Sequence, residues 1–211
     1  MHIYAFGSVC RGEVSPSSDV DILAVVEGSD PRFDANVYSV YSYKRLSELW
    51  REGNPFAWHL SIESKLIYSA DNVDFIKTLG CPSPYKNCLN DCNKFHLVFK
   101  DARASIAQRS PSSVFDLSTV FLSIRNIATC FSLGTSFFPN FSRHSALRLG
   151  SDSIPLSASV YQIFERARVL CTRGYGLKLS EEEVGTAIQH LGEIEDWIIQ
   201  LLKKVEVYER I

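Results

Sequence analysis

The sequence predicts an α+β protein in which a small mixed β-sheet platform with flanking helices is followed by an all-α helical bundle. Before residue 80, short apolar runs rich in β-branched and aromatic residues alternate with Gly, Ser and Pro, as in strands joined by turns. After residue 85, apolar residues recur every three or four positions, as in amphipathic helices. Two prolines and a glycine interrupt both patterns within residues 79–85. We therefore expect a first domain over residues 1–80 and a helical domain over residues 85–211.

The first domain is expected to contain four strands and a short helix. Three strands are predicted from the apolar runs at residues 3–6, 20–26 and 37–41. The first two of these are expected to be neighbours joined by a turn. A helix over residues 44–51 is stopped by Gly53-Asn54-Pro55. The apolar segment at residues 58–68 (WHLSIESKLIY) is expected to contain the fourth strand.

The second domain is expected to consist of four amphipathic helices. Apolar residues at helical spacing predict them over residues 88–106, 114–131, 157–173 and 180–205. Gly174 ends the third of them. The fourth begins with a capping box, in which Ser180 caps the helix and Glu183 reaches back. Four such helices in sequence favour a bundle.

Composition and charge narrow the class of protein. The 211 residues carry a net charge of −2, with 45% hydrophobic and 22% charged residues, which excludes disordered, collagen-like and coiled-coil chains. Neither half is basic enough for charge alone to indicate a nucleic-acid partner. The six cysteines are scattered and follow no secretory signal, so we expect free thiols in the cytoplasm. We expect no membrane-spanning segment.

Two aspartates spaced by one residue open the second predicted strand. Because side chains alternate along a strand, Asp19 and Asp21 are expected to point together while Val20 and Ile22 face the core. Two adjacent carboxylates repel each other unless a cation lies between them, and hard oxygen ligands select Mg²⁺ or Mn²⁺. The pair therefore predicts a site for one of these metals.

A glycine and a serine close the first predicted strand. Gly7 lets backbone N–H groups approach an anion closely, and the Ser8 hydroxyl adds a donor, so this turn can hold phosphate oxygens. Gly7 and Gly12 have the glycine spacing of a P-loop, but Glu13-Val14 stand where that motif requires Lys and Ser or Thr. A phosphate at this turn and a metal on the next strand together indicate a nucleotide site.

These residues resemble the signature of the DNA polymerase β-type nucleotidyltransferase superfamily. The resemblance consists of Gly7-Ser8, ten intervening residues and Asp19-Val20-Asp21, a spacing similar to that of the minimal nucleotidyltransferase branch. The Arg11-Gly12 turn and Ser18 before the aspartates add to it. The signature covers residues 6–26, about a tenth of the chain.

The resemblance implies transfer of a nucleoside monophosphate from an NTP to an acceptor, with pyrophosphate as the leaving group. Asp19 and Asp21 would bind the metal ions. The residues that would hold the nucleotide and its phosphates are Gly7, Ser8, Arg11 and Ser18. We expect ATP as the nucleotide, AMP as the transferred group, and a small molecule or a protein as the acceptor.

Active members of this superfamily usually carry a third carboxylate on a following strand. The strand expected within residues 35–43 has none. We expect Glu63 to take this place as a catalytic residue and third metal ligand, because an acidic residue in an apolar strand needs an explanation; an exposed strand residue or a salt bridge is the alternative. Asp34 is better explained as a turn residue. His59 is expected on the same strand face as Glu63.

The helical domain admits two interpretations. In antibiotic-modifying nucleotidyltransferases, a helical domain behind the catalytic platform supplies contacts to the acceptor. Alternatively, Arg125, Asn126 and Cys130 resemble the R-N-x-x-x-H pattern of HEPN domains, with a cysteine in the place of the histidine. Because a thiol does not easily replace imidazole as an acid–base partner at neutral pH, we expect any RNase chemistry to be lost.

The second interpretation gives an alternative function. It is a catalytically weakened nucleotidyltransferase whose HEPN-like helices act as a binding or homodimerisation module in a toxin–antitoxin or defence system. Basic residues in the loops at residues 141–150 and 171–176 could contact phosphate, acceptor or RNA. Their charges are too few to give RNA more than weak support as a partner.

Overall fold

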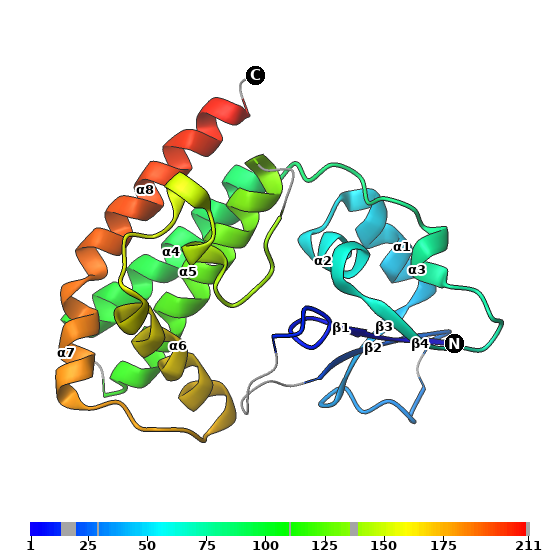
Figure 1. Cartoon of the computed structure of the whole chain (residues 1–211), viewed down its shortest axis with the longest axis horizontal. Helices are drawn as coiled ribbons and strands as arrows, with labels where there is room; N and C mark the ends of the chain where they lie inside the picture. The colour runs from blue at the N-terminus through cyan, green and yellow to red at the C-terminus, as the bar shows by residue number, and fades with distance from the viewer. Residues whose placement is uncertain (14–19, 29, 110, 136–138, 210–211) are drawn as a thin grey trace. The chain divides into compact units, whose positions relative to one another are not determined.

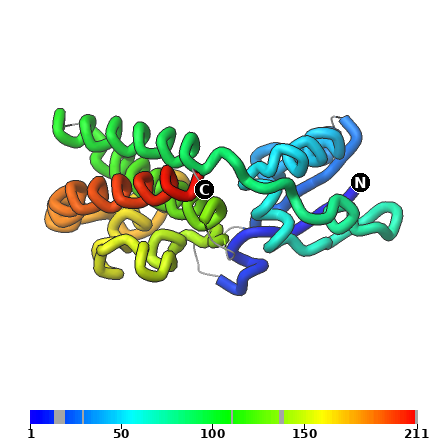
Figure 2. The backbone as a smooth tube through the Cα atoms, turned by 90° about the horizontal axis from the view of Figure 1, so that it is seen from above, coloured from blue at the N-terminus to red at the C-terminus, as the bar shows by residue number. Residues whose placement is uncertain are grey.

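The computed structural model describes residues 1–13, 20–28, 30–109, 111–135 and 139–209 of the chain. The chain divides into two compact units, Met1–Lys86 and Asn87–Ile211. Figure 1 shows that the first unit combines a sheet with helices, whereas the second is built from helices, whose coils can also be followed along the backbone in Figure 2. The α+β fold class predicted from the sequence is therefore confirmed.

The first unit is organised around a four-stranded mixed sheet with the strand order β3-β2-β1-β4. Its strands are β1 (His2–Phe6), β2 (Asp21–Val26), β3 (Tyr38–Ser42) and β4 (Lys65–Ser69). β1 pairs in antiparallel fashion with both β2 and β4, whereas β2 and β3 run parallel. The first two predicted strands are therefore neighbours, as expected.

Three helices lie over one face of this sheet (Figure 1): α1 (Tyr43–Glu52), α2 (Pro55–Glu63) and α3 (Phe75–Thr78). They bury the apolar side chains of that face in one core, which includes Leu23 and Val25 from β2 and Leu46 and Trp50 from α1. Gly53 ends α1 with φ of +65°, and a Cβ there would lie 2.5 Å from the Pro84 carbonyl oxygen. The predicted helix stop is thus confirmed.

The fourth strand predicted within residues 58–68 is present, but it occupies only the end of this segment. Pro55–Glu63 forms α2, and the strand β4 starts only at Lys65. Asn54 caps α2, with its side chain accepting a hydrogen bond from the Phe56 backbone N–H, and Pro55 occupies the first turn, where a missing N–H costs nothing. Asn54-Pro55 therefore begins α2 directly after Gly53 has ended α1.

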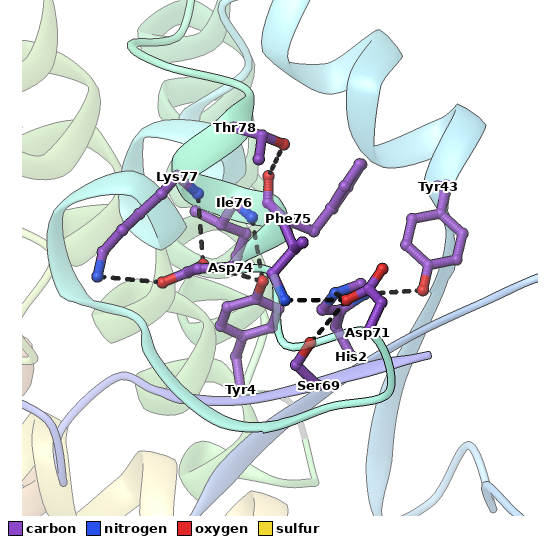
Figure 3. Close-up of polar contacts among 11 residues, drawn as sticks. His2, Tyr4, Tyr43, Ser69, Asp71, Asp74, Phe75, Ile76, Lys77 and Thr78 are labelled. Carbon is purple, nitrogen blue, oxygen red and sulfur yellow. Dashed lines mark hydrogen bonds and ion pairs between the residues drawn. The ribbon is translucent and has the colours of Figure 1, made fainter.

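A partly buried polar network ties β1 to the segment between β4 and α3 (Figure 3). His2, only 2% exposed, contacts the Tyr43 hydroxyl through Nδ1 at 2.8 Å and the Asp71 carboxylate through Nε2 at 3.0 Å. Tyr4 donates its hydroxyl hydrogen to Asp74 at 3.1 Å and accepts a hydrogen bond from the Ile76 backbone N–H at 3.0 Å. Burial raises the pKa of Tyr4, so this hydroxyl stays protonated and keeps both bonds.

The second unit contains five α-helices and two short 3₁₀ turns among its described residues. The helices are α4 (Cys88–Ala107), α5 (Ser113–Thr135), α6 (Ala158–Arg173), α7 (Glu181–Gln189) and α8 (Leu191–Tyr208). α5 is the central helix, because it packs against α4, α6 and α8. The capping box of Ser180 and Glu183 is confirmed, and Gly174 ends α6 with φ of +69°.

The single helix predicted over residues 180–205 is two helices. The chain bends at His190, which ends α7 and starts α8. Its ring Nδ1 lies 2.9 Å from the Thr186 carbonyl oxygen, and its backbone N–H bonds to the Ala187 carbonyl in a tighter turn. The apolar spacing runs through the bend without interruption, which is why it predicts one helix.

α5 is long and apolar enough to cross a membrane by length and composition, but 67% of its most apolar window is buried inside the structure. Its buried side chains include Leu117, Ile124 and Phe131. Burial on this scale is what the core helix of a bundle requires. The helix therefore supplies the centre of the second unit's core.

Three cysteines lie together in that core. Cys88 and Cys92 of α4 donate through their thiols to the carbonyl oxygens of Cys130 and Ile127 on α5. Hydrogen bonds with the neighbouring thiols and burial raise the pKa of Cys92. The Cys92 thiol is therefore protonated at neutral pH, and the three buried cysteines act as small apolar residues with weak donors.

We predict that Tyr4→Phe weakens the first unit, with a free energy of unfolding lower by about 1–3 kcal/mol, because the Ile76 N–H loses its acceptor inside the core. Amide hydrogen exchange should become faster over β1 and α3. Peptides from the second unit serve as the internal reference. Tyr68→Phe, on a side chain that is 47% exposed, is the control and should leave exchange unchanged. Equal effects of the two substitutions would contradict the role of the network.

We predict that the six thiols react with a disulfide reagent in separate phases. Exposed Cys81 and Cys171 should react first, and Cys10 more slowly, because burial raises its pKa. The three core thiols should react only when the chain unfolds: Cys88, Cys92 and Cys130. A Cys81→Ser/Cys171→Ser variant should lose the fast phase. Fast labelling of Cys130 in the native protein would contradict its burial.

Candidate functional site

The candidate site is built where β1 ends beside the start of β2. Phe6, the last residue of β1, pairs with Asp21, the first residue of β2. The chain leaves β1 at Gly7, whose φ is +76°. A Cβ on Gly7 would lie 2.4 Å from Oδ2 of Asp21, closer than any carbon can approach. A side chain at this position would therefore force the Asp21 carboxylate to move, and the left-handed backbone also favours glycine.

The turn after Gly7 is wound tightly. The Gly7 carbonyl accepts hydrogen bonds from the backbone N–H groups of Cys10 and Arg11, at 3.1 and 3.3 Å, and the Ser8 carbonyl accepts from Glu13 at 2.9 Å. Within the described part of the chain, the N–H groups of Ser8 and Val9 donate no hydrogen bond to another backbone carbonyl of the turns and loops. The start of this turn can therefore direct N–H groups to an anion.

Asp21 lies on the same sheet face as Leu23 and Val25, which are buried under the helices, but its own side chain is exposed. The expectation that Val20 and Ile22 face the core is wrong, because Val20 is 54% exposed and Ile22 is half-buried on the other face. Two predicted site residues, Asp19 and Ser18, lie outside the described residues.

A cleft of about 400 Å³ opens beside Asp21. It is lined by residues 20–22 and by residues 35–39, which lead into β3. Asn36, Tyr38 and Ser39 are polar residues of this lining that sequence reasoning did not single out. Asp34 closes the turn before them, since its carboxylate accepts hydrogen bonds from the backbone and side-chain nitrogens of Asn36, both at 2.9 Å. The interpretation of Asp34 as a turn residue agrees with these bonds.

Glu63 lies at the C-terminal end of α2, and the expectation that it lies on a strand is wrong. His59 does lie near Glu63, but on a helix and not on a strand. Residues four positions apart share one face of a helix. The His59 Nε2 atom is 2.8 Å from Oε2 of Glu63. The same carboxylate oxygen accepts a hydrogen bond from Nη1 of Arg11. Glu63, with its side chain 9% exposed, thus joins α2 to the turn after Gly7.

Arg11 is held from two sides. Its Nε donates to Glu13 at 2.9 Å, and its Nη1 donates to Glu63. The side chain is 20% exposed, so the guanidinium is largely desolvated but still reaches the surface. The predicted phosphate contact and the predicted third carboxylate are therefore in contact with each other, a link that spans 52 residues of sequence.

The candidate residues of the second unit have structural contacts. Arg125 donates through Nη2 to the Phe141 carbonyl at 3.2 Å, and its own carbonyl accepts from the Ser145 hydroxyl at 3.1 Å. Cys130, which stands where HEPN domains have a histidine, is buried between α4 and α5. These contacts favour a packing role for Arg125 and Cys130.

The described residues include no group of three or more His, Cys, Asp or Glu side chains that could hold a metal ion. What they offer at the site is the exposed carboxylate of Asp21, which lies beside Gly7 and lines the cleft. Carboxylate oxygens are the ligands preferred by Mg²⁺ and Mn²⁺. The donor type at this position therefore fits such an ion, with Asp19 as the second carboxylate expected from the sequence.

Comparisons with known proteins agree with this geometry. The family model described as a nucleotidyltransferase domain matches residues 2–90, the segment that contains the sheet, the Gly7 turn and Asp21. A comparison with curated proteins finds no significant match. The family generally uses divalent metal ions and NTP substrates. Residues 2–90 of this chain are therefore a nucleotidyltransferase domain of the DNA polymerase β-type superfamily.

Proposed function

We propose that the protein is a metal-dependent nucleotidyltransferase that transfers AMP from ATP to a hydroxyl group of a small molecule or a protein. The observation that carries this proposal is the contact between Gly7 and Asp21, where a Cβ would come within 2.4 Å of the carboxylate. At this contact, a turn that can bind phosphate lies next to a carboxylate that can bind Mg²⁺. Both features belong to the domain that the family match covers.

In the proposed reaction, the acceptor oxygen forms a bond to the α-phosphorus of ATP, while the bond from that phosphorus to the β-phosphate oxygen breaks. Pyrophosphate leaves, and the acceptor proton passes to solvent or to a carboxylate. Asp19 and Asp21 would hold Mg²⁺ or Mn²⁺, which would supply positive charge to stabilise the negative charge that develops during phosphoryl transfer. The Gly7-Ser8 turn holds the terminal phosphates through its N–H groups.

Arg11 and Ser18 complete the proposed nucleotide contacts. A guanidinium can offer two parallel N–H donors to phosphate oxygens, and Arg11 extends from the same turn as Ser8. Glu63 as the third metal ligand remains a prediction from the sequence. Its hydrogen bonds to Arg11 and His59 support a different role, in which Glu63 holds Arg11 in place.

One observation favours the alternative of a weakened enzyme. Among the described residues that line the cleft, Asp21 is the carboxylate, and the segment leading into β3 contributes Asn36 and Ser39 instead of an acid. A protein with this arrangement can bind nucleotide and metal but react slowly. Binding and turnover must therefore be measured separately.

We predict that Asp21→Asn abolishes metal-dependent binding of ATP. The amide keeps the shape of the side chain but removes the negative charge that attracts the cation. Calorimetric titration with ATP, GTP, CTP and UTP, each with and without Mg²⁺, measures this loss and names the nucleotide. Glu52→Gln, which removes an acid paired with Arg45 on the surface of the same unit, is the control for charge. Binding of ATP by Asp21→Asn with unchanged Mg²⁺ dependence would contradict the proposed site.

We predict that Gly7→Ala lowers ATP affinity at least tenfold, whereas Gly12→Ala does not. Both glycines have left-handed backbones, with φ of +76° and +74°, so both substitutions strain the turn by about 1–2 kcal/mol. A Cβ at Gly12 meets nothing within 4 Å, but at Gly7 it displaces Asp21. The comparison therefore separates displacement of the carboxylate from backbone strain. Equal losses in the two variants would show that the Gly7 contact has no special role.

A further inference from the structure

We infer that Glu63 and His59 position Arg11 for the nucleotide phosphates, and that Glu63 acts on Arg11 and not on the metal. This inference rests on the proposed function. It assigns the specific task of phosphate recognition to a cluster formed by α2 and the turn after Gly7. In this cluster Arg11 is the residue that contacts phosphate, and Glu63 and His59 are positioning residues.

The contacts of Arg11 fix the direction of its guanidinium. The backbone N–H of Arg11 bonds to the Gly7 and Ser8 carbonyls, at 3.3 and 3.2 Å, so the residue is rigidly joined to the turn. Its Nε is held by Glu13 at 2.9 Å and its Nη1 by Glu63. A guanidinium has five N–H donors. The bonds to Glu13 and Glu63 therefore leave other donors available for an anion. A fixed Arg loses less side-chain entropy on binding phosphate than a mobile one.

Glu63 is itself held in place. Its Oε2 accepts the Arg11 hydrogen bond and lies 2.8 Å from His59 Nε2, which donates to the ionised carboxylate. The His59 ring packs edge-on against Phe6, with ring centroids 5.6 Å apart. Phe6 is the residue before Gly7 and pairs with Asp21. Phe6, at the end of β1, therefore connects the cluster both to the Gly7 turn and to Asp21.

The location of Glu63 argues against a purely stabilising role. A carboxylate at the C-terminal end of a helix lies at the negative end of the helix dipole, where a basic residue would be favoured. Arg11 offsets this repulsion, and the pair is largely buried, with side chains 20% and 9% exposed. Helix stability alone would not select an acid there, whereas the need to hold Arg11 against the turn does.

The test combines Glu63→Gln with Arg11→Gln in the full chain and measures ATP affinity in the presence of Mg²⁺. With Arg11 present, Glu63→Gln should weaken ATP binding about fivefold, because a charge-assisted anchor becomes a neutral one. Without Arg11, an ionised Glu63 is left near the phosphates and repels them. Glu63→Gln should therefore tighten binding in the Arg11→Gln background, which reverses the sign of its effect.

The metal is tested separately by titrating the protein with Mn²⁺ in the absence of ATP and following the free ion by electron paramagnetic resonance. Glu63→Gln should leave the midpoint of this titration unchanged, whereas a metal ligand would shift it tenfold or more. Glu52→Gln, an acid paired with Arg45 on the surface of the same unit, is the matched control and should alter neither measurement. If Glu63→Gln does not fold, His59→Leu replaces it, and should weaken ATP binding through loss of the second donor to Glu63.

The outcomes separate this inference from the function on which it rests. If the wild-type protein binds no NTP, the proposed function is overturned. If the wild type binds ATP, but Glu63→Gln shifts the Mn²⁺ midpoint or weakens ATP binding in both backgrounds, the positioning role is overturned and the proposed function stands. Unchanged ATP affinity of Glu63→Gln in the wild-type background overturns the positioning role as well.

Discussion

The candidate site depends on the antiparallel register between β1 and β2. Phe6 pairs with Asp21, so the chain turns at Gly7 directly beside the carboxylate. A shift of one residue would turn Asp21 to the opposite face and remove it from the turn. The register is fixed by apolar burial, because Leu23 and Val25 share the face of Asp21 and lie under α1 and α2. The core of the first unit thus determines the position of its polar site.

The same strand end explains why α2 contributes to the site. Phe6 contacts both Phe56 and His59, with ring centroids 5.7 and 5.6 Å apart, and so sets the distance between the strand and the helix. This packing brings Glu63, one turn after His59, into contact with Arg11. A change in the packing of Phe6 would therefore affect Asp21, the Gly7 turn and Arg11 together. The residues of the site are therefore connected by packing and hydrogen bonds, although they come from three separate segments.

Much of this arrangement could be predicted from the sequence, since the strands that carry Gly7 and Asp21 follow from local residue patterns. α2 could not be found from periodicity, because residues 56–62 are apolar or aromatic at almost every position and fit a strand or a helix. Its start signal was present in Asn54-Pro55, which marks a helix beginning as well as a helix end. The bond between Arg11 and Glu63 is a tertiary contact, and no local pattern encodes it.

The division of roles within the site bears on the acceptor. If Glu63 serves Arg11, the carboxylates available near the α-phosphate are Asp21 and the predicted Asp19, and both are engaged by metal in the proposed mechanism. An acceptor hydroxyl must then lose its proton to one of these carboxylates or to water. Acceptors whose oxygen ionises readily need less help from a base, and their attack would be faster at such a site. The chemistry of the acceptor is therefore linked to whether Glu63 holds Arg11 or the metal.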